Sequence, residues 1–161
     1  MKLSKNNKII YFILCVITTS LLDLYLSSFI IENQHSFQQS CFSKFIEFTY
    51  YENTGAAFSI LENTTLLLIL IGVFSTVVLT YLLIKHIDKA KTFDCFLLAM
   101  LVSGILCNTY ERITFGFVRD YFQLKTIYFP VFNISDILIN ISVLAIIVVA
   151  IKYNKKKSNN E

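Results

Sequence analysis

The chain has 161 residues, of which 55% are hydrophobic and only 16% are charged. This composition excludes an ordinary soluble domain and is typical of an integral membrane protein, and the length predicts a single domain over residues 1–161. The formal net charge of +3 is explained by basic residues that lie beside anionic lipid headgroups, so we expect membrane lipids and no nucleic acid as partners.

Four apolar runs follow one another along the chain, and each suits one helical crossing of a hydrocarbon core about 30 Å thick. They lack the alternation of lipid-facing strands, so helices are predicted. The predicted helices cover about 9–31, 65–84, 93–110 and 137–151, and a polar, disordered tail is expected over 152–161. The expected fold class is an all-α membrane protein with four transmembrane helices and a small extracytoplasmic region that contains β-structure.

The basic residues predict the orientation in the membrane. Ten of the 14 lysines and arginines lie before the first run, between the second and third runs, or after the fourth run. The other four lie in the two longer connections. Because basic residues accumulate on the cytoplasmic side, we expect both termini and the short connection to be cytoplasmic and the two long connections to face outward.

The two outward connections have features of a functional region. Aromatic and β-branched residues alternate with polar residues over residues 45–51, which predicts short strands. Three of the four glycines and the only proline, Pro130, lie in these connections or at the outer end of the third run. Glycine and proline serve special backbone geometry or close approach, so the outward face is the predicted site.

Cysteine and histidine are placed in a way that does not suggest metal chemistry. Cys15, Cys95 and Cys107 fall in predicted helices, Cys41 lies in a connection, and the two histidines lie on opposite sides of the membrane. No pair has the spacing of a metal site or a disulfide framework. We therefore expect neither a metal ion nor another cofactor.

Three acidic residues stand in apolar surroundings. Asp23 lies within the first predicted helix, while Asp120 and Asp136 flank the third connection. Asp136 follows Asn133 by three residues, a spacing that also fits simple capping of the fourth helix. If Asp120 and Asp136 meet at the outer membrane surface, they can share one proton and activate water, as the two carboxyl groups of aspartic proteases do.

Four segments together resemble the ordered motifs of the signal peptidase II family, the lipoprotein signal peptidases. They are YENTGAAFS (51–59), SGILCNTYERI (103–113), FVRDYF (117–122) and FNISD (132–136). The resemblance implies an aspartic endopeptidase of the bacterial cytoplasmic (inner) membrane that acts at the extracytoplasmic face. It implies cleavage of diacylglyceryl-modified prolipoproteins just before the lipidated cysteine, without a metal, and inhibition by the cyclic peptide globomycin.

The same resemblance assigns roles to individual residues. Asp120 and Asp136 match the two catalytic aspartates, and Asp23 matches a first-helix aspartate with a structural role. The residues that match substrate-binding or bracing positions are Asn53, Gly55, Asn108, Arg112 and Asn133.

The chain departs from the family motif at Cys107, where the motif has Gly, and at Glu111, where it has Asp. These departures identify a divergent member with an intact aspartate pair. Two other functions remain open. A catalytically silent relative could bind lipopeptides in the same cleft. A proton or ion pathway could use Asp23 and Asp136, although the helices lack the Gly/Pro-interrupted segments of midplane transport sites.

Overall fold

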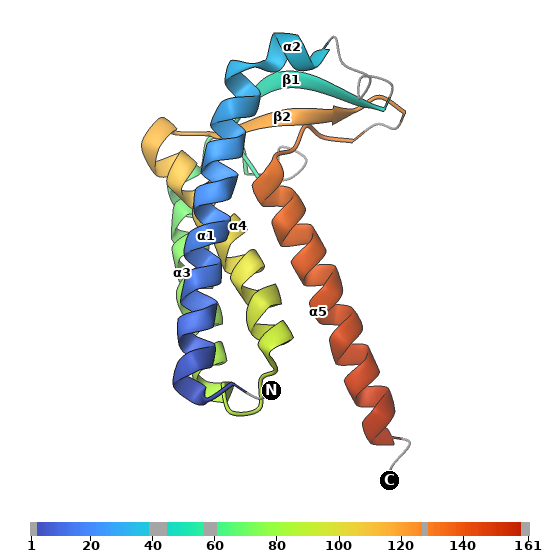
Figure 1. Cartoon of the computed structure of the whole chain (residues 1–161). Helices are drawn as coiled ribbons and strands as arrows, with labels where there is room; N and C mark the ends of the chain where they lie inside the picture. Colours follow the sequence, from blue (N-terminus) through green and yellow to red (C-terminus); the bar gives the residue numbers. More distant parts are fainter. Residues whose placement is uncertain (1–2, 39–44, 57–60, 127–128, 159–161) are drawn as a thin grey trace.

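The computed structural model describes residues 3–38, 45–56, 61–126 and 129–158. Figure 1 shows long helices running side by side, with two strands lying across one end. Within the described part of the chain, four helices are long and apolar enough to cross a membrane. This arrangement confirms the predicted fold class. The elements in chain order are α1 (Lys5–Glu32), α2 (Gln34–Gln38), β1 (Ile46–Asn53), α3 (Thr65–His86), α4 (Thr92–Phe115), β2 (Val118–Leu124) and α5 (Ile134–Ser158).

The long helices extend beyond the apolar runs that predict them. α4 continues to Phe115 rather than ending near residue 110, and α5 begins at Ile134 and continues to Ser158. Hydropathy marks only the part of a helix that lies in hydrocarbon, whereas backbone hydrogen bonding continues through good helix formers such as lysine. The expected disorder of the polar tail is therefore wrong as far as Ser158.

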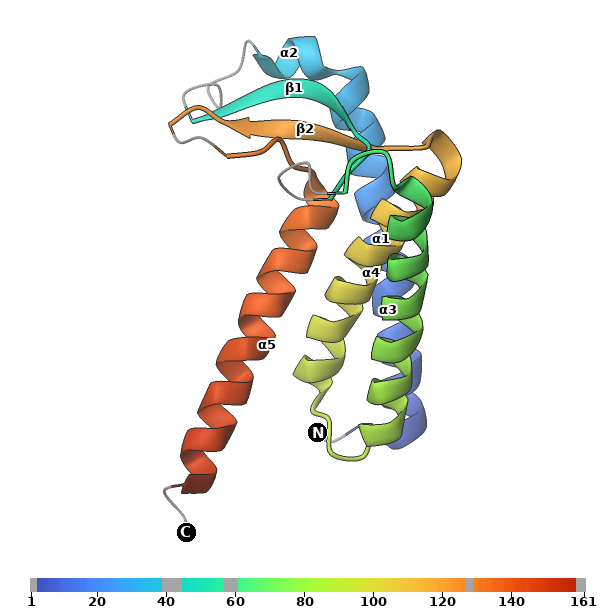
Figure 2. The same cartoon turned by 180° about the vertical axis from the view of Figure 1, so that it is seen from behind.

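Helix α4 is the centre of the bundle, and α1, α3 and α5 each pack against it (Figure 2). Half of its apolar window (50%) is buried in the protein, whereas 11% or less is buried in each of the other three. The buried face of α4 carries small side chains, including Ala99, Ser103, Gly104 and Cys107. Small residues let helix backbones approach closely, which is how membrane helices gain contact in a solvent as apolar as their own side chains.

Two glycines mark the closest helix contacts. A Cβ atom on Gly104 would lie 2.6 Å from the Ser135 carbonyl oxygen and 2.8 Å from the Ile139 side chain, so α4 and α5 meet at this point. A Cβ atom on Gly72 would collide with the hydroxyl of Thr109, where α3 meets α4. Both contacts lie close to the pocket described below. Gly72, Thr109 and Ile139 line that pocket, and Gly104 and Ser135 are each next to a residue that lines it.

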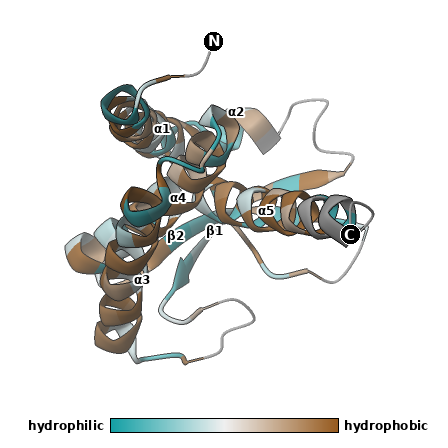
Figure 3. Ribbon diagram, turned by 90° about the horizontal axis from the view of Figure 1, so that it is seen from below, coloured by the Kyte–Doolittle hydropathy of each residue, from teal (hydrophilic) through white to brown (hydrophobic). Residues whose placement is uncertain are grey.

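The outer faces of α1, α3 and α5 expose large apolar side chains. Leu21, Phe74 and Leu144 are 62%, 70% and 64% exposed, respectively. Figure 3 shows α3 coloured as hydrophobic along most of its length. Such exposure suits a bilayer, because hydrocarbon solvates these side chains without a protein partner.

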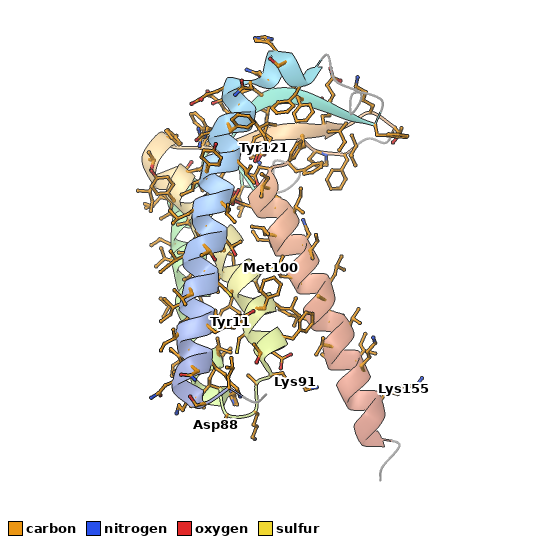
Figure 4. The ribbon with its side chains drawn as sticks, viewed as in Figure 1. Tyr11, Asp88, Lys91, Met100, Tyr121 and Lys155 are labelled. Carbon is orange, nitrogen blue, oxygen red and sulfur yellow. The ribbon has the colours of Figure 1, made fainter. Side chains whose placement is uncertain are left out.

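The two ends of the molecule differ in character. Both termini lie at one end of the helices and the sheet lies at the other (Figure 1). Figure 4 shows Asp88, Lys91 and Lys155 toward the end with the termini, and Tyr121 between the sheet and the helices. Helix α5 leans away from the other helices toward its C-terminal end (Figures 1 and 2).

Strands β1 and β2 form an antiparallel pair with one irregularity. Phe48 pairs with Phe122, but the next aligned pair is Tyr51 with Asp120, so β1 contains one residue more than β2 over this interval. Such a bulge bends a strand and changes which side chains face each surface. Beyond the bulge, Tyr51 and Asn53, rather than Tyr50 and Glu52, lie on the face that carries Asp120.

Candidate active site

A pocket of about 780 Å³ lies where the sheet meets α3, α4 and α5. Its apolar lining includes Leu68 and Ile71 from α3, Ile105 from α4 and Ile139 from α5. Five of the residues that the sequence motifs single out also line it: Asn53, Asn108, Arg112, Asp120 and Asp136. Residues from two strands and two helices, far apart in the chain, therefore contribute polar groups to one largely apolar pocket.

The N-terminal end of α5 holds Asp136 by reciprocal capping. The Asp136 backbone N–H donates to Asn133 Oδ1 at 2.9 Å, and the Asn133 backbone N–H donates to Asp136 Oδ2 at 3.2 Å. This is the pattern of a capping box, in which two otherwise unpaired amide groups of the first turn are satisfied. Capping and a site role are therefore compatible for Asp136, because only part of its carboxyl group is used by the cap.

Asn108 ties Asp136 to the central helix. Its Nδ2 donates to Asp136 Oδ1 at 2.9 Å, and its Oδ1 accepts from Asn133 Nδ2 at 3.0 Å. The close approach at Gly104, one turn earlier on α4, brings the two helices near enough for these short side chains to meet. Asn133 is only 3% exposed, so it braces Asp136 from behind instead of lining the pocket.

Asp120 reaches the pocket from β2. Asn53 Nδ2 donates to Asp120 Oδ2 at 2.9 Å, a diagonal contact across the strand pair. The Gly55 backbone N–H in turn donates to Asn53 Oδ1 at 2.9 Å, and Arg112 Nη2 donates to the Gly55 carbonyl at 2.6 Å. Gly55 thus does not line the pocket but links the end of β1 to the guanidinium group that does.

The surroundings of Asp120 favour its neutral form. The side chain is fully buried, and its Oδ1 has no hydrogen-bond partner among the described residues. Burial, followed by repulsion from Asp136, raises the pKa of Asp120 to about 8, although the Asn53 hydrogen bond and the charge of Arg112 act in the opposite direction. Asp136, the other acidic residue that lines the pocket, is thus one of the charges that act on Asp120.

Asp23 lies outside the pocket and joins three elements behind it. Ser135, the neighbour of Asp136, donates to Asp23 Oδ2, and Ser27 donates to Asp23 Oδ1 at 3.2 Å. The Ser27 hydroxyl is 2.7 Å from the hydroxyl of Tyr121, which follows Asp120. Asp23 therefore contacts the start of α5 directly and β2 through Ser27, an arrangement that fits the structural role implied by the sequence.

Several contacts of this region are not indicated by the sequence motifs. Tyr121 accepts a hydrogen bond from the Ile134 backbone N–H at 3.2 Å, and burial raises the pKa of its phenol. Asn140 lines the pocket one helical turn after Asp136, and that four-residue spacing on one helix could have identified it. Buried Glu111 and half-buried Arg119 form an ion pair beside the pocket. Nothing in the linear sequence pairs these two residues.

The positions of the cysteines agree with free thiols. Cys15, Cys95 and Cys107 are unpaired, and Cys107 Sγ lies 3.7 Å from the Ser20 carbonyl oxygen between α4 and α1. Cys41 falls outside the described residues. Over the ranges that the structure describes, no three His, Cys, Asp or Glu side chains cluster closely enough to hold a metal ion.

The comparisons with known proteins agree with these observations. A family model described as signal peptidase (SPase) II matches residues 14–152. The lipoprotein signal peptidase of Clostridioides difficile (strain 630) is 32% identical over 108 residues, which are 67% of this chain and 72% of that protein. The lipoprotein signal peptidase of Clostridium novyi (strain NT) is 32% identical over 114 residues, which are 69% of this chain and 76% of that protein.

A solved structure described as a bacterial membrane enzyme superposes with a TM-score of 0.77 at 25% sequence identity. The match covers 91% of this chain and 90% of that one, so the helices and the sheet correspond together. The family model spans most of the described helices and both strands. The chain therefore belongs to the signal peptidase II family.

Proposed function

We propose that this protein removes signal peptides from lipid-modified prolipoproteins, and that Asp120 and Asp136 are its catalytic pair. The family and the curated relatives named lipoprotein signal peptidase support an aspartic-type peptidase in the bacterial membrane. The observation that carries the catalytic assignment is the shared pocket. Two carboxyl groups, one from β2 and one from α5, line a largely apolar pocket at the end of four membrane-spanning helices.

The two carboxyl groups have different surroundings, which suggests different roles. Asp136 accepts hydrogen bonds from Asn108 and from the Asn133 backbone at the start of a helix, and such donors stabilise a carboxylate. Asp120 is buried, accepts one hydrogen bond from Asn53, and has a pKa raised to about 8. We therefore assign Asp136 as the general base and protonated Asp120 as the general acid.

The proposed reaction conserves protons over one cycle. Asp136 takes a proton from water as the oxygen attacks the scissile carbonyl carbon, and Asp120 gives its proton to the carbonyl oxygen. When the carbon–nitrogen bond breaks, Asp136 passes its proton to the departing amine. A hydroxyl of the tetrahedral intermediate returns a proton to Asp120. Both carboxyl groups then regain their starting states.

The other polar groups of the pocket are suited to holding an extended peptide. Asn53 and Arg112 line the pocket and present amide and guanidinium groups, and Gly55 contacts both from outside it. Asn133 contacts Asn108 and Asp136 instead. Arg112 Nε is buried and has no partner among the described residues, so it can donate to a substrate carbonyl group. The apolar lining from α3 and α5 would accept the apolar part of the signal peptide and its acyl chains.

We also infer the orientation. The excess of lysines at the end that carries both termini supports a cytoplasmic location for that end. The pocket lies at the opposite end, beside the sheet, and would then open at the extracytoplasmic face. This position suits a substrate whose lipidated cysteine sits at the outer membrane boundary.

The test is cleavage of a diacylglyceryl-modified prolipoprotein by the purified protein in detergent. We expect release of the signal peptide, inhibition by globomycin and full activity in EDTA. The unlipidated precursor serves as the matched control and should be cleaved poorly. Binding of the precursor without cleavage would identify a silent lipopeptide-binding relative instead, and activity that is lost in EDTA and restored by zinc would refute the metal-free mechanism.

The pH dependence should follow from the surroundings of Asp120. Its pKa is raised to about 8, so the acid form that the mechanism needs is present below that pH and is lost as the pH rises through it. We expect kcat to fall tenfold for each pH unit well above that value, and to fall at low pH as Asp136 becomes protonated. Measured kcat that stays constant from pH 7 to pH 10 would exclude Asp120 as the acid.

A further inference from the structure

Glu111 lies near the end of α4, where the chain turns back toward the sheet. The helix ends at Phe115, and Gly116 follows with a φ of 88°, a left-handed conformation that favours glycine. After this turn β2 begins at Val118, two residues before Asp120. Glu111 is 4% exposed and does not line the pocket, so its carboxylate is directed at neighbouring protein groups.

Among the described residues, the hydrogen bonds to the Glu111 carboxylate come from Arg119. The Arg119 backbone N–H donates to Glu111 Oε2 at 2.7 Å. The guanidinium group donates to Glu111 Oε1 from Nε at 3.0 Å and from Nη2 at 2.6 Å. Its carbon also lies 4.6 Å from the centre of the Phe115 ring. One buried carboxylate thus binds both the main chain and the side chain of the residue that precedes Asp120.

Asp120 depends on its backbone for its position. Asn53 gives its carboxyl group one hydrogen bond, and the other oxygen has no partner among the described residues. The strand partner residues, Glu52 opposite Arg119 and Tyr51 opposite Asp120, follow the bulge in β1, where the ladder is irregular. The hydrogen bond from the Arg119 backbone to Glu111 therefore fixes the main chain beside Asp120, whose own side chain is held by the single hydrogen bond from Asn53.

One turn of α4 connects the parts of the site. Asn108 contacts Asp136, Arg112 contacts Gly55 beside Asn53, and Glu111 contacts the residue before Asp120. These three side chains share one helix, so α4 contacts both the α5 side and the strand side of the site. Loss of the Glu111 contacts would release the β2 side while leaving the α5 side in place.

We propose that Glu111, through its contacts with Arg119, is a positioning residue that holds Asp120 in register with Asp136 for the reaction. This role rests on the proposed function, because it assumes that Asp120 reacts. Neither member of the ion pair lines the pocket, so their loss should change kcat and leave substrate binding nearly unchanged. A displacement of about 1 Å at a reacting group can lower the rate about 10²-fold.

The experiment measures kcat and KM on the lipidated precursor for Glu111→Ala, Arg119→Gln, Asp120→Asn and a control, Glu47→Ala. Glu47 is an exposed carboxylate on β1, so its loss should change kcat less than about twofold. Glu111→Ala removes all three hydrogen bonds, and we expect kcat to fall about 10-fold to 100-fold at unchanged KM. Arg119→Gln keeps the backbone N–H on Glu111, so a smaller fall of about threefold to tenfold is expected.

The amount of folded monodisperse protein is measured on the same samples. A fall in kcat that only matches a loss of folded protein overturns the positioning role. If Glu111→Ala does not fold, Arg119→Gln decides, because wild-type kcat in that variant overturns the proposal and reduced kcat at unchanged KM supports it. Full activity in Asp120→Asn would overturn both proposals. Inactive Asp120→Asn together with wild-type kcat in both ion-pair variants would overturn the positioning role alone.

Discussion

Replacing either Asp120 or Asp136 with Asn is expected to abolish signal-peptide cleavage while substrate binding persists. Asparagine has nearly the same volume as aspartate but cannot take up or release the proton that the proposed mechanism moves. Loss of one general acid or base lowers a rate by about 10²-fold to 10⁴-fold. The measurement is kcat and precursor affinity for each variant, with Glu52→Gln, an exposed β1 carboxylate, as the matched control.

The inactive Asp120→Asn variant should still fold, and its stability provides a second check. The pKa of Asp120 is raised to about 8, whereas that of an aspartate in an unfolded chain is about 3.9. Its contribution to stability is therefore full below the lower value and decreases as the pH rises toward the higher one. The neutral asparagine avoids this loss, so the variant should melt at a higher temperature than the wild type at pH 8 but not at pH 4. Near-wild-type cleavage by either Asn variant would remove that residue from the pair.

The second large effect is expected for Gly104→Val. The first added carbon alone would lie 2.6 Å from the Ser135 carbonyl oxygen, so α4 and α5 must separate. Overpacking of this kind costs about 1–3 kcal/mol, and the movement would shift the residue next to Asp136. We therefore expect a lower melting temperature in detergent together with a fall in kcat of about 10²-fold, as for a displaced reacting group.

A control for this variant is available on the lipid-facing side of the same pair of helices. Leu144 is 64% exposed on α5, so Leu144→Val changes volume without touching α4 and should leave both melting temperature and kcat unchanged. A Gly104→Val protein that melts and cleaves like the wild type would show that the contact between α4 and α5 yields more readily than the structure indicates.

The sequence was sufficient to predict the membrane helices and to single out the aspartates. Each helix has a long apolar run, which can be recognised in the sequence without knowing which residues pack against it. Asp120 and Asp136 stand out in the sequence because each lies in an apolar setting and within a family motif. The structure brings both to one pocket, and their catalytic roles stay predictions until the variants are measured.

The contacts that arrange the site depend on geometry that a linear pattern does not contain. Glu111 and Arg119 are eight residues apart and meet only because Gly116 reverses the chain between them. Asp23 pairs with Ser135 across 112 positions, which depends on how α1 and α5 pack around α4. The apolar run does not predict the helical continuation to Ser158, because hydropathy reports on lipid contact and not on backbone hydrogen bonds.

Because of the bulge in β1, the side chains that reach the pocket depend on the number of residues in this strand. Side chains alternate with a period of two, and the extra residue between Phe48 and Tyr51 reverses that alternation for the rest of the strand. Deleting one residue there would leave a single residue opposite Tyr121, so the ladder would become regular and Asn53 would stay on the face of Asp120. Deleting both residues would bring Glu52 opposite Asp120 and turn Asn53 away, replacing an amide donor with a second negative charge. The effect of a deletion in this strand therefore depends on whether the number of deleted residues is odd or even, because that number decides which β1 side chains face Asp120.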